Sequence, residues 1–320
     1  METQKWTDKN ARIHIFPTSD IFVRYLLASP KNTDITKSFI NAVLEDSGRR
    51  QVNSVTITSP FNLRQSIRDK ETVMDIKVQD TDGCPYDIEI QNTGSPVIME
   101  RITYYGTHLY LDQIGESEQY DKLRQCIVIA LLSRHIYGYG KKVKPAEKLH
   151  HVSLVVHDDD HETPFYPDGD QQVYHILELD RFENNAEAVY DIDGKGMQRK
   201  LSASLFGWLR FFSEGAREDF MQKYNETDQL VGKAKREYEK FLKTESLRDA
   251  QFRHEMWLHD RAQDKADARR EGLEEGLEEG RTEGARANAL ANARNLRRLG
   301  VSDEIIAEAT GVTPREIAAL

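Results

Sequence analysis

The chain has 320 residues, of which 38% are hydrophobic and 31% charged, and its formal net charge at neutral pH is −10. This length accommodates one large domain with an appendage or two modest domains, and the apolar content suffices for a packed core. The acidic balance argues against a protein that coats nucleic acid by bulk electrostatics, so local basic groups must hold any bound phosphate.

The N-terminal residues and the cysteines bear on the compartment of the protein. The opening METQKWTDKNARI has no apolar segment typical of a secretory signal peptide, and no apolar run is long enough to span a bilayer. The two cysteines, Cys84 and Cys126, argue against a disulfide framework and fit a reducing compartment. We therefore expect a soluble, cytoplasmic protein with no membrane contact.

Two helices and a short strand are expected first. Ser19 or Asp20 can cap a helix that ends at Pro30. A second helix over 32–46 carries an apolar stripe at helical spacing, made of Ile35, Phe39 and Val43. A short strand over 52–58 and a polar loop lead to the next feature.

A hairpin over 71–91 is the most informative stretch of the chain. Two runs alternate between apolar and polar residues, which predicts two half-buried strands joined by a turn at Asp82-Gly83. Both polar sets must face the same side, which favours a three-residue loop, 81–83, with Gly83 in the left-handed conformation. This register places Asp75 opposite Glu89 and Lys77 opposite Asp87.

The facing carboxylates of Asp75 and Glu89 have two interpretations. Like charges directly opposite one another repel, and a divalent cation with oxygen ligands between them relieves that repulsion. Alternatively, the polar face of the hairpin is a solvated surface, and Lys77 opposite Asp87 is an ordinary ion pair. The spacing alone leaves both open.

The middle of the chain predicts a mixed sheet packed with helices. An amphipathic helix over 96–114 buries Ile98, Ile102, Tyr105 and Leu109. The run 124–132 indicates a strand buried on both faces, with a helix as the alternative. Further strands are expected over 151–157 and 173–179, with an apolar helix over 201–212. This order of elements indicates an α/β fold with helices on a mixed sheet.

The last third of the chain has a different composition. Charged, helix-favouring residues dominate to about Arg298, and glycine recurs every fourth residue from Gly272 to Gly284. The glycine column could admit a second helix, as in a dimer, or belong to a solvated linker helix. Two short helices close the chain, with a capping box at Thr313 to Glu316, and suit packing or oligomerisation rather than reading a DNA groove.

Several ordered motifs together resemble one family. They are Asp20 with FVRYLLASPKN, then SFINAVLED, MDIKVQDTDGCPYDIEIQ, Arg101 with TYYGTHLYLDQ, Tyr120 with DKL, YHILELDRF and the ending GVTPREI. The chain is similar in these motifs, over roughly residues 10–320, to the PD-(D/E)XK nuclease family transposases, also called recombination-promoting nucleases. The resemblance implies a restriction-endonuclease-like mixed sheet and a metal-dependent DNA endonuclease linked to recombination, mobile elements or phage defence.

The resemblance also assigns roles to residues. Asp75 and Glu89 match the acids that bind Mg²⁺ or another divalent cation, and Gln91 stands where the wider superfamily has lysine. Asp20 matches an acid of the first helix that supports the metal site. As an amide, Gln91 cannot act as a base or carry charge, so Lys77 is a candidate for the missing positive group. Arg101 is a candidate for a DNA phosphate contact or for a structural ion pair from its helix.

The resemblance and the composition together divide the chain into three parts. We expect a nuclease-like domain over 1–213, a charged helical extension over 214–298 and a small two-helix element over 299–320. The expected partner is DNA, with a homo-oligomer formed through the C-terminal helices as a further possibility. The alternative function is a weak or inactive nuclease fold that binds DNA or a protein, or an assembly module.

Overall fold

The structure is a computed structural model that describes residues 15–61, 76–92, 97–133, 150–154, 157–158, 163–164, 170–179, 189–191, 198–214 and 229–320. The chain divides into two compact units, Met1–Glu255 and Met256–Leu320. No helix in the described ranges is both long enough and apolar enough to cross a membrane.

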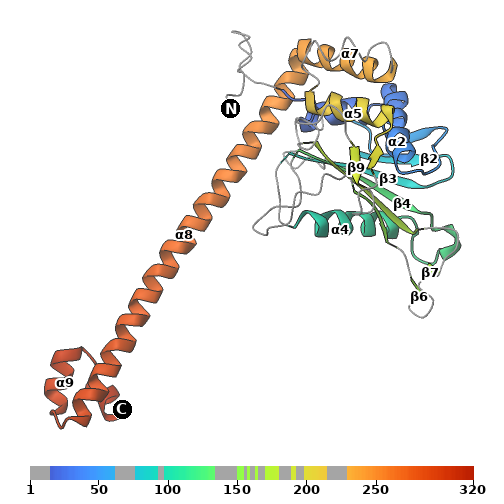
Figure 1. Ribbon diagram of the computed structural model, residues 1–320. Helices are drawn as coiled ribbons and strands as arrows, with labels where there is room; N and C mark the ends of the chain where they lie inside the picture. Colours follow the sequence, from blue (N-terminus) through green and yellow to red (C-terminus); the bar gives the residue numbers. More distant parts are fainter. Residues whose placement is uncertain are drawn as a thin grey trace. The chain divides into compact units, whose positions relative to one another are not determined.

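A six-stranded mixed sheet forms the centre of the first unit as far as the structure describes it (Figure 1). Its order is β1 (Val55–Ile57), β2 (Ile76–Asp80), β3 (Pro85–Gln91), β4 (Cys126–Leu132), β8 (Gln172–Glu178) and β5 (His150–Leu154). Strands β3, β4 and β8 run parallel, and the other pairs are antiparallel. Two short ribbons lie apart from it, β6 (His157–Asp158) with β7 (Thr163–Pro164) and β9 (Val189–Asp191) with β10 (Gln198–Lys200).

Helices cover both faces of the sheet, which confirms the predicted mixed α/β fold. One face packs against α1 (Asp20–Leu27), α2 (Thr33–Asp46), α5 (Ala203–Glu214) and α7 (Gln229–Lys243), while α4 (Ile98–Leu111) lies on the other (Figure 1). Short 3₁₀ turns occur at Pro30–Asn32 and Tyr120–Lys122. The predicted stripe of α2 and the two-sided burial of β4 are both confirmed.

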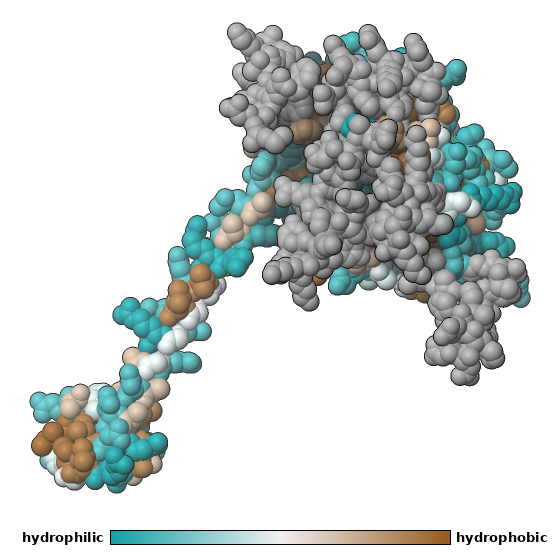
Figure 2. All heavy atoms as spheres, viewed as in Figure 1, coloured by the Kyte–Doolittle hydropathy of each residue, from teal (hydrophilic) through white to brown (hydrophobic). Residues whose placement is uncertain are grey.

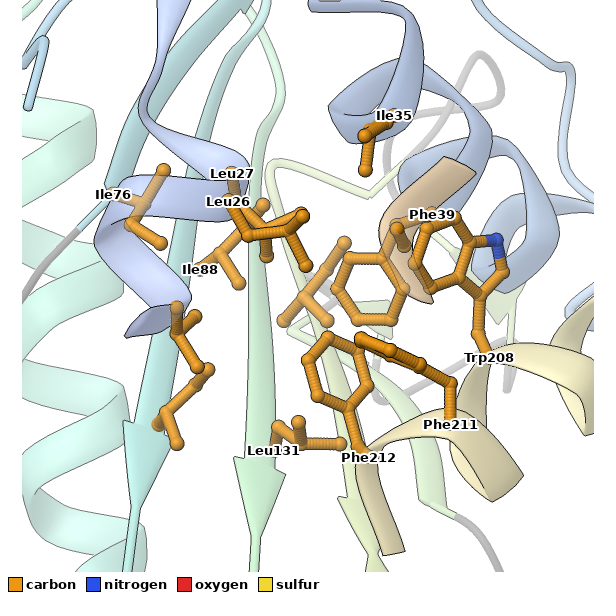
Figure 3. Close-up of a cluster of buried hydrophobic side chains, with 14 of the residues drawn as sticks. Leu26, Leu27, Ile35, Phe39, Ile76, Ile88, Leu131, Trp208, Phe211 and Phe212 are labelled. Carbon is orange, nitrogen blue, oxygen red and sulfur yellow. The ribbon is translucent and has the colours of Figure 1, made fainter. Parts of the chain in front are cut away.

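The larger core lies between the sheet and the first group of helices. Figure 3 shows aromatic side chains of α2 and α5 packed together beside Ile88 and Leu131 of the sheet. The Trp208 ring stacks on Phe212 at 6.1 Å, and Phe39 meets Trp208 edge-on at 5.7 Å. Each such side chain contributes roughly 1.5–3 kcal/mol by leaving water, so this cluster fixes α2 and α5 on the sheet.

Helix α7 and the first turns of α8 (Glu245–Arg298) also belong to this core. Phe22 of α1 contacts Tyr238 at 4.9 Å and Phe241 at 5.3 Å between ring centroids. Leu247 and Ala250 of α8 are buried in the same cluster. The core therefore draws on residues beyond position 213, where the sequence predicts the first domain to end.

The β2–β3 hairpin has the predicted register. Lys77 pairs with Asp87 and Ile76 with Ile88, and Gly83 at the turn has φ of +83°. The Gly83 N–H donates to the Asp80 carbonyl at 3.2 Å, which closes the three-residue loop. The described part of the hairpin begins at residue 76, so Asp75 lies outside the described residues.

Helix α4 approaches the sheet closely at a glycine. Ile98, Ile102 and residues of β4 and β8 form a second apolar cluster on this face. A Cβ atom added to Gly106 would lie 2.5 Å from the Tyr174 hydroxyl oxygen and 2.7 Å from a ring carbon, so only glycine fits. Tyr105, predicted to be buried, is instead half-buried, because it lies over the polar edge of this face.

The second unit consists of the rest of α8, α9 (Asp303–Thr310) and α10 (Pro314–Ala318). Ala293 of α8 packs with the two short helices through a buried apolar cluster completed by Ile306, Val312 and Ile317. Gly311 ends α9 with φ of +69°, and the predicted Thr313–Glu316 capping box begins α10. Figure 2 shows apolar patches between the polar side chains of α8, where Leu273 and Leu277 are exposed.

Candidate functional site

Polar residues gather on the α4 face of the sheet at strands β2 and β3. The alternation sends Ile88 and Ile90 into the larger core and turns Asp87, Glu89 and Gln91 towards the α4 side. Both carboxylate residues are only 2% exposed. Because a charged group is costly to bury without partners, this face needs donors and cations of its own.

Glu89 receives those contacts from Gln91 and Arg101. The Gln91 amide donates from Nε2 to Glu89 Oε1, while its own Oε1 accepts from Arg101 Nη1 at 3.1 Å. Arg101 Nη2 lies 3.4 Å from Glu89 Oε1 and donates to the Tyr105 hydroxyl at 3.0 Å. Since a carboxylate only accepts and a guanidinium only donates, the two partners fix the orientation of the Gln91 amide.

Lys77 lies on the predicted face, with its ammonium directed at α4. Its Nζ is 3.8 Å from Asp112 Oδ2, an atom that also lies 2.9 Å from His108 Nδ1. The positive group in contact with Glu89 is the Arg101 guanidinium, which agrees with the structural ion pair that the sequence left open beside a phosphate contact. The pairing depends on how α4 is turned over the sheet, which no local pattern in the sequence gives.

Asp20, at the start of α1, is tied to the end of β3. Its Oδ1 accepts from Asn92 Nδ2 at 3.1 Å, and its Oδ2 lies 3.0 Å from His254 Nε2 of α8. Asn92 directly follows Gln91, and its own Oδ1 accepts from the Ser133 hydroxyl at 2.8 Å, just beyond β4. Asp20 is therefore brought to the carboxyl ends of two parallel strands, where α/β sheets commonly place their sites.

Sequence reasoning missed three of these residues, Asn92, Ser133 and His254. A signal for His254 was present, since buried positions on this part of α8 fall at helical spacing: Leu247, Ala250, Gln251 and His254. Because two of these four residues are polar and the residues around them are charged, the buried stripe cannot be recognised by hydrophobicity alone. Asn92 and Ser133 follow strand ends and carry no pattern that distinguishes them.

The oxygen donors at this site suit a hard divalent cation. Carboxylate and amide oxygens, offered here by Glu89 and Gln91, are the ligands that Mg²⁺ prefers. In the described ranges no group of three or more His, Cys, Asp or Glu side chains could hold a metal ion. The predicted second ligand, Asp75, lies outside those ranges.

The two cysteines do not supply a nucleophile to this site. Burial, with Asp80 and Asp82 nearby, raises the pKa of the Cys84 thiol to about 11, and burial raises the pKa of Cys126 to about 12. Both thiols are therefore protonated at neutral pH and poor nucleophiles.

The comparison with known families agrees with this architecture. The family model of the PD-(D/E)XK nuclease family transposases matches residues 17–268, which include every element of the site described above. Neither the curated proteins nor the solved structures gave a match. With a helix-flanked mixed sheet and a family match over most of its length, the chain belongs to the PD-(D/E)XK nuclease family transposases and has their restriction-endonuclease-like α/β fold.

Proposed function

We propose that the protein is a divalent-cation-dependent DNA endonuclease that hydrolyses phosphodiester bonds, with Mg²⁺ as the expected ion. The observation that carries the proposal is the buried Glu89 carboxylate, held by Gln91 and Arg101 at the end of a parallel strand. Burying a carboxylate beside a cation costs desolvation free energy, which a charged residue on a plain surface does not incur. A buried and paired acid of this kind is typical of a functional site.

In this proposal Asp75 and Glu89 hold the metal ion. A divalent cation bound there would polarise a phosphodiester oxygen and lower the pKa of a water molecule. That water would lose a proton as its oxygen bonds to phosphorus, and the leaving oxygen would take up a proton as its own bond to phosphorus breaks. Gln91 orients the water or the phosphate by hydrogen bonding, and Asp20 supports the site from α1.

Arg101 supplies the positive charge that a lysine at position 91 would otherwise give. The Arg101 side chain is 40% exposed, so it can reach a phosphate while it remains beside Glu89. A guanidinium also matches the two oxygens of a phosphate with parallel hydrogen bonds. Lys77, on the same face beside Asp112, adds a second cation for the DNA backbone.

The proposal is tested by nicking of supercoiled plasmid DNA in Mg²⁺ and in chelator. We expect cleavage only with the metal, and a loss of at least about 100-fold in rate for Asp75→Ala and Glu89→Ala. Asp82→Ala is the matched control, because Asp82 is an exposed acid in the turn of the same hairpin. If all three variants cleave as fast as the parent protein, the site is assigned wrongly.

A second candidate is a nuclease fold that binds DNA or a protein without cleaving it. The observation in its favour is Gln91, whose amide is engaged by both Glu89 and Arg101 and cannot act as a base. Calorimetry separates the two, since retained DNA binding together with no uptake of Mg²⁺ or Mn²⁺ favours this candidate.

The C-terminal helices support a further proposal, assembly into a homo-oligomer. Gly272, Gly276, Gly280 and Gly284 leave open space at their Cβ positions, and Leu273 and Leu277 are exposed beside them. Glycine costs about 1 kcal/mol in a helix relative to alanine, which close approach of a second helix offsets. Light scattering of the full chain and of the Leu273→Glu/Leu277→Glu variant tests the proposed oligomer. If this surface pairs two helices, the variant should have a lower molecular mass in solution than the parent chain.

We also propose a role in recombination, mobile elements or phage defence; the description of the family as transposases supports the link to mobile elements. The thiols of Cys84 and Cys126 are both free, which suits the reducing cytoplasm. Along the chain we propose a nuclease-like part over 1–213, whose core also includes α7 and the first turns of α8 from the helical extension 214–298, and a two-helix element over 299–320.

A further inference from the structure

The first turns of α8 reach the candidate site from the far end of the sequence. His254 Nε2 lies 3.0 Å from Asp20 Oδ2, although the two residues are 234 positions apart. The histidine side chain is 3% exposed and the aspartate 18%, so the contact is largely shielded from water. A shielded hydrogen bond between these groups is stronger and better fixed than one at the surface.

Each oxygen of Asp20 has its own partner. Asn92 Nδ2 binds Oδ1 at 3.1 Å, and the same nitrogen donates to the Thr18 carbonyl at 2.8 Å. A carboxylate can only accept, so the contact with Oδ2 requires a proton on His254 Nε2. With one donor on each oxygen, the carboxylate cannot rotate without breaking a bond.

The same contacts continue into the sheet. Asn92 is the residue after Gln91, and the Ser133 hydroxyl, beyond β4, donates to Asn92 Oδ1 at 2.8 Å. Ser133 N–H also donates to the Gln91 carbonyl at 3.0 Å, which extends the β3–β4 ladder by one step. The bonded series His254, Asp20, Asn92 and Ser133 thus ends at the backbone of Gln91.

We infer that His254 is a positioning residue for the cleavage reaction, which makes the start of α8 part of the site. It fixes the carboxylate of Asp20 and, through Asn92, the end of β3 that carries Gln91. This inference rests on the proposed function. Residues that orient groups of a metal site typically contribute about 10- to 100-fold to its affinity or activity.

Gln251, a neighbour of His254 on α8, allows a positioning role of His254 to be distinguished from a purely structural one. Gln251 Oε1 accepts from the Ile21 N–H at 3.1 Å, so it anchors α8 to the same end of α1 without contacting Asp20. If α8 only needs anchoring, the loss of Gln251 and the loss of His254 should affect activity alike.

The experiment compares His254→Leu, His254→Gln and Gln251→Leu in the full chain by plasmid nicking and thermal unfolding. We expect His254→Leu to lower kcat about 10- to 100-fold with the KM for DNA within about twofold. His254→Gln, which keeps a donor near the position of Nε2, should recover most of kcat. Gln251→Leu should lower Tm with kcat retained, and equal kcat losses in the two leucine variants overturn the inference.

Two further measurements complete the test. Because His254 acts through Asp20, Asp20→Asn/His254→Leu should be no slower than Asp20→Asn alone, whereas multiplied losses contradict the inference. If the parent protein does not nick DNA, the proposed function fails, and amide hydrogen exchange still tests the positioning. His254→Leu should then speed amide hydrogen exchange at residues 91–92, and Gln251→Leu should not. Equal exchange rates in the two variants would overturn the positioning role of His254.

Discussion

Arg101 gives the sharpest prediction, because its removal should affect stability and metal binding in opposite directions. Arg101→Met keeps most of the apolar stem and removes the charge 3.4 Å from the buried Glu89 carboxylate. At that distance two unit charges interact by about 5 kcal/mol at an effective dielectric constant of 20. The Arg101 side chain is 40% exposed, and solvent screening lowers the expected loss in the free energy of unfolding to about 2 kcal/mol.

At the proposed metal site, a bound divalent cation and the Arg101 guanidinium would both neutralise Glu89 and would repel one another. Arg101→Met should therefore bind Mg²⁺ or Mn²⁺ more tightly, by roughly tenfold, while it cleaves DNA about 100-fold more slowly because the phosphate loses its partner. Urea unfolding in chelator measures the free energy of unfolding, titration calorimetry measures the metal affinity, and plasmid nicking measures the cleavage rate.

Arg50→Met is the matched control for the stability effect. Arg50 lies 3.6 Å from Asp82, a separation close to that of the Arg101 pair, but the two side chains are 80% and 62% exposed. Exposed ion pairs of this kind contribute about 0–1 kcal/mol, so the control should barely change unfolding. Equal effects of the two substitutions, or weaker metal binding by Arg101→Met, would refute the reasoning.

Three further predictions concern the fold. Phe241→Ala, in the aromatic cluster with Phe22, should cost about 3–5 kcal/mol in urea unfolding, and a loss below about 1 kcal/mol would show that α7 is not part of the core. Gly106→Ala should push α4 off Tyr174, lowering both Tm and the nicking rate, whereas a stability like that of the parent would contradict the close packing. Hydrogen bonds from Arg286 and Thr313 lower the pKa of Glu316 to about 2. The native pKa is thus depressed, so the stabilisation of α10 is present above about pH 4.5 and is lost as the pH falls towards 2. An NMR titration of the Glu316 carboxyl carbon should show the depressed pKa, and a midpoint near 4.5 would contradict this prediction.

The hairpin was predictable because its information is local. Alternation fixes which residues share a face, and Gly83 fixes the loop length, so the pairing of Lys77 with Asp87 follows from neighbours along the chain. The same holds for α10, whose capping box lies within four residues. In each case the determining contacts join residues close in sequence.

The contacts of the site were not predictable in the same way. Arg101 reaches Glu89 because α4 crosses the sheet at one rotation and depth, set by the Gly106 approach to Tyr174. The sequence places α7 in the charged helical extension, since the charged residues between its buried positions, Val231, Ala234, Tyr238 and Phe241, lower its overall hydrophobicity. The pairing of His254 with Asp20 depends on how the whole fold brings distant segments together.

The burial of α7 and the start of α8 in the first unit has a consequence for interpreting genes of this kind. An open reading frame interrupted between codons 214 and 237 still encodes Asp20, Asp75, Glu89, Gln91 and Arg101. Its product would lack the rings of Tyr238 and Phe241 that cover Phe22, and the imidazole that binds Asp20. Intact motifs therefore do not identify a gene that encodes a working protein. The stop codon must also lie beyond the codons for Tyr238, Phe241 and His254.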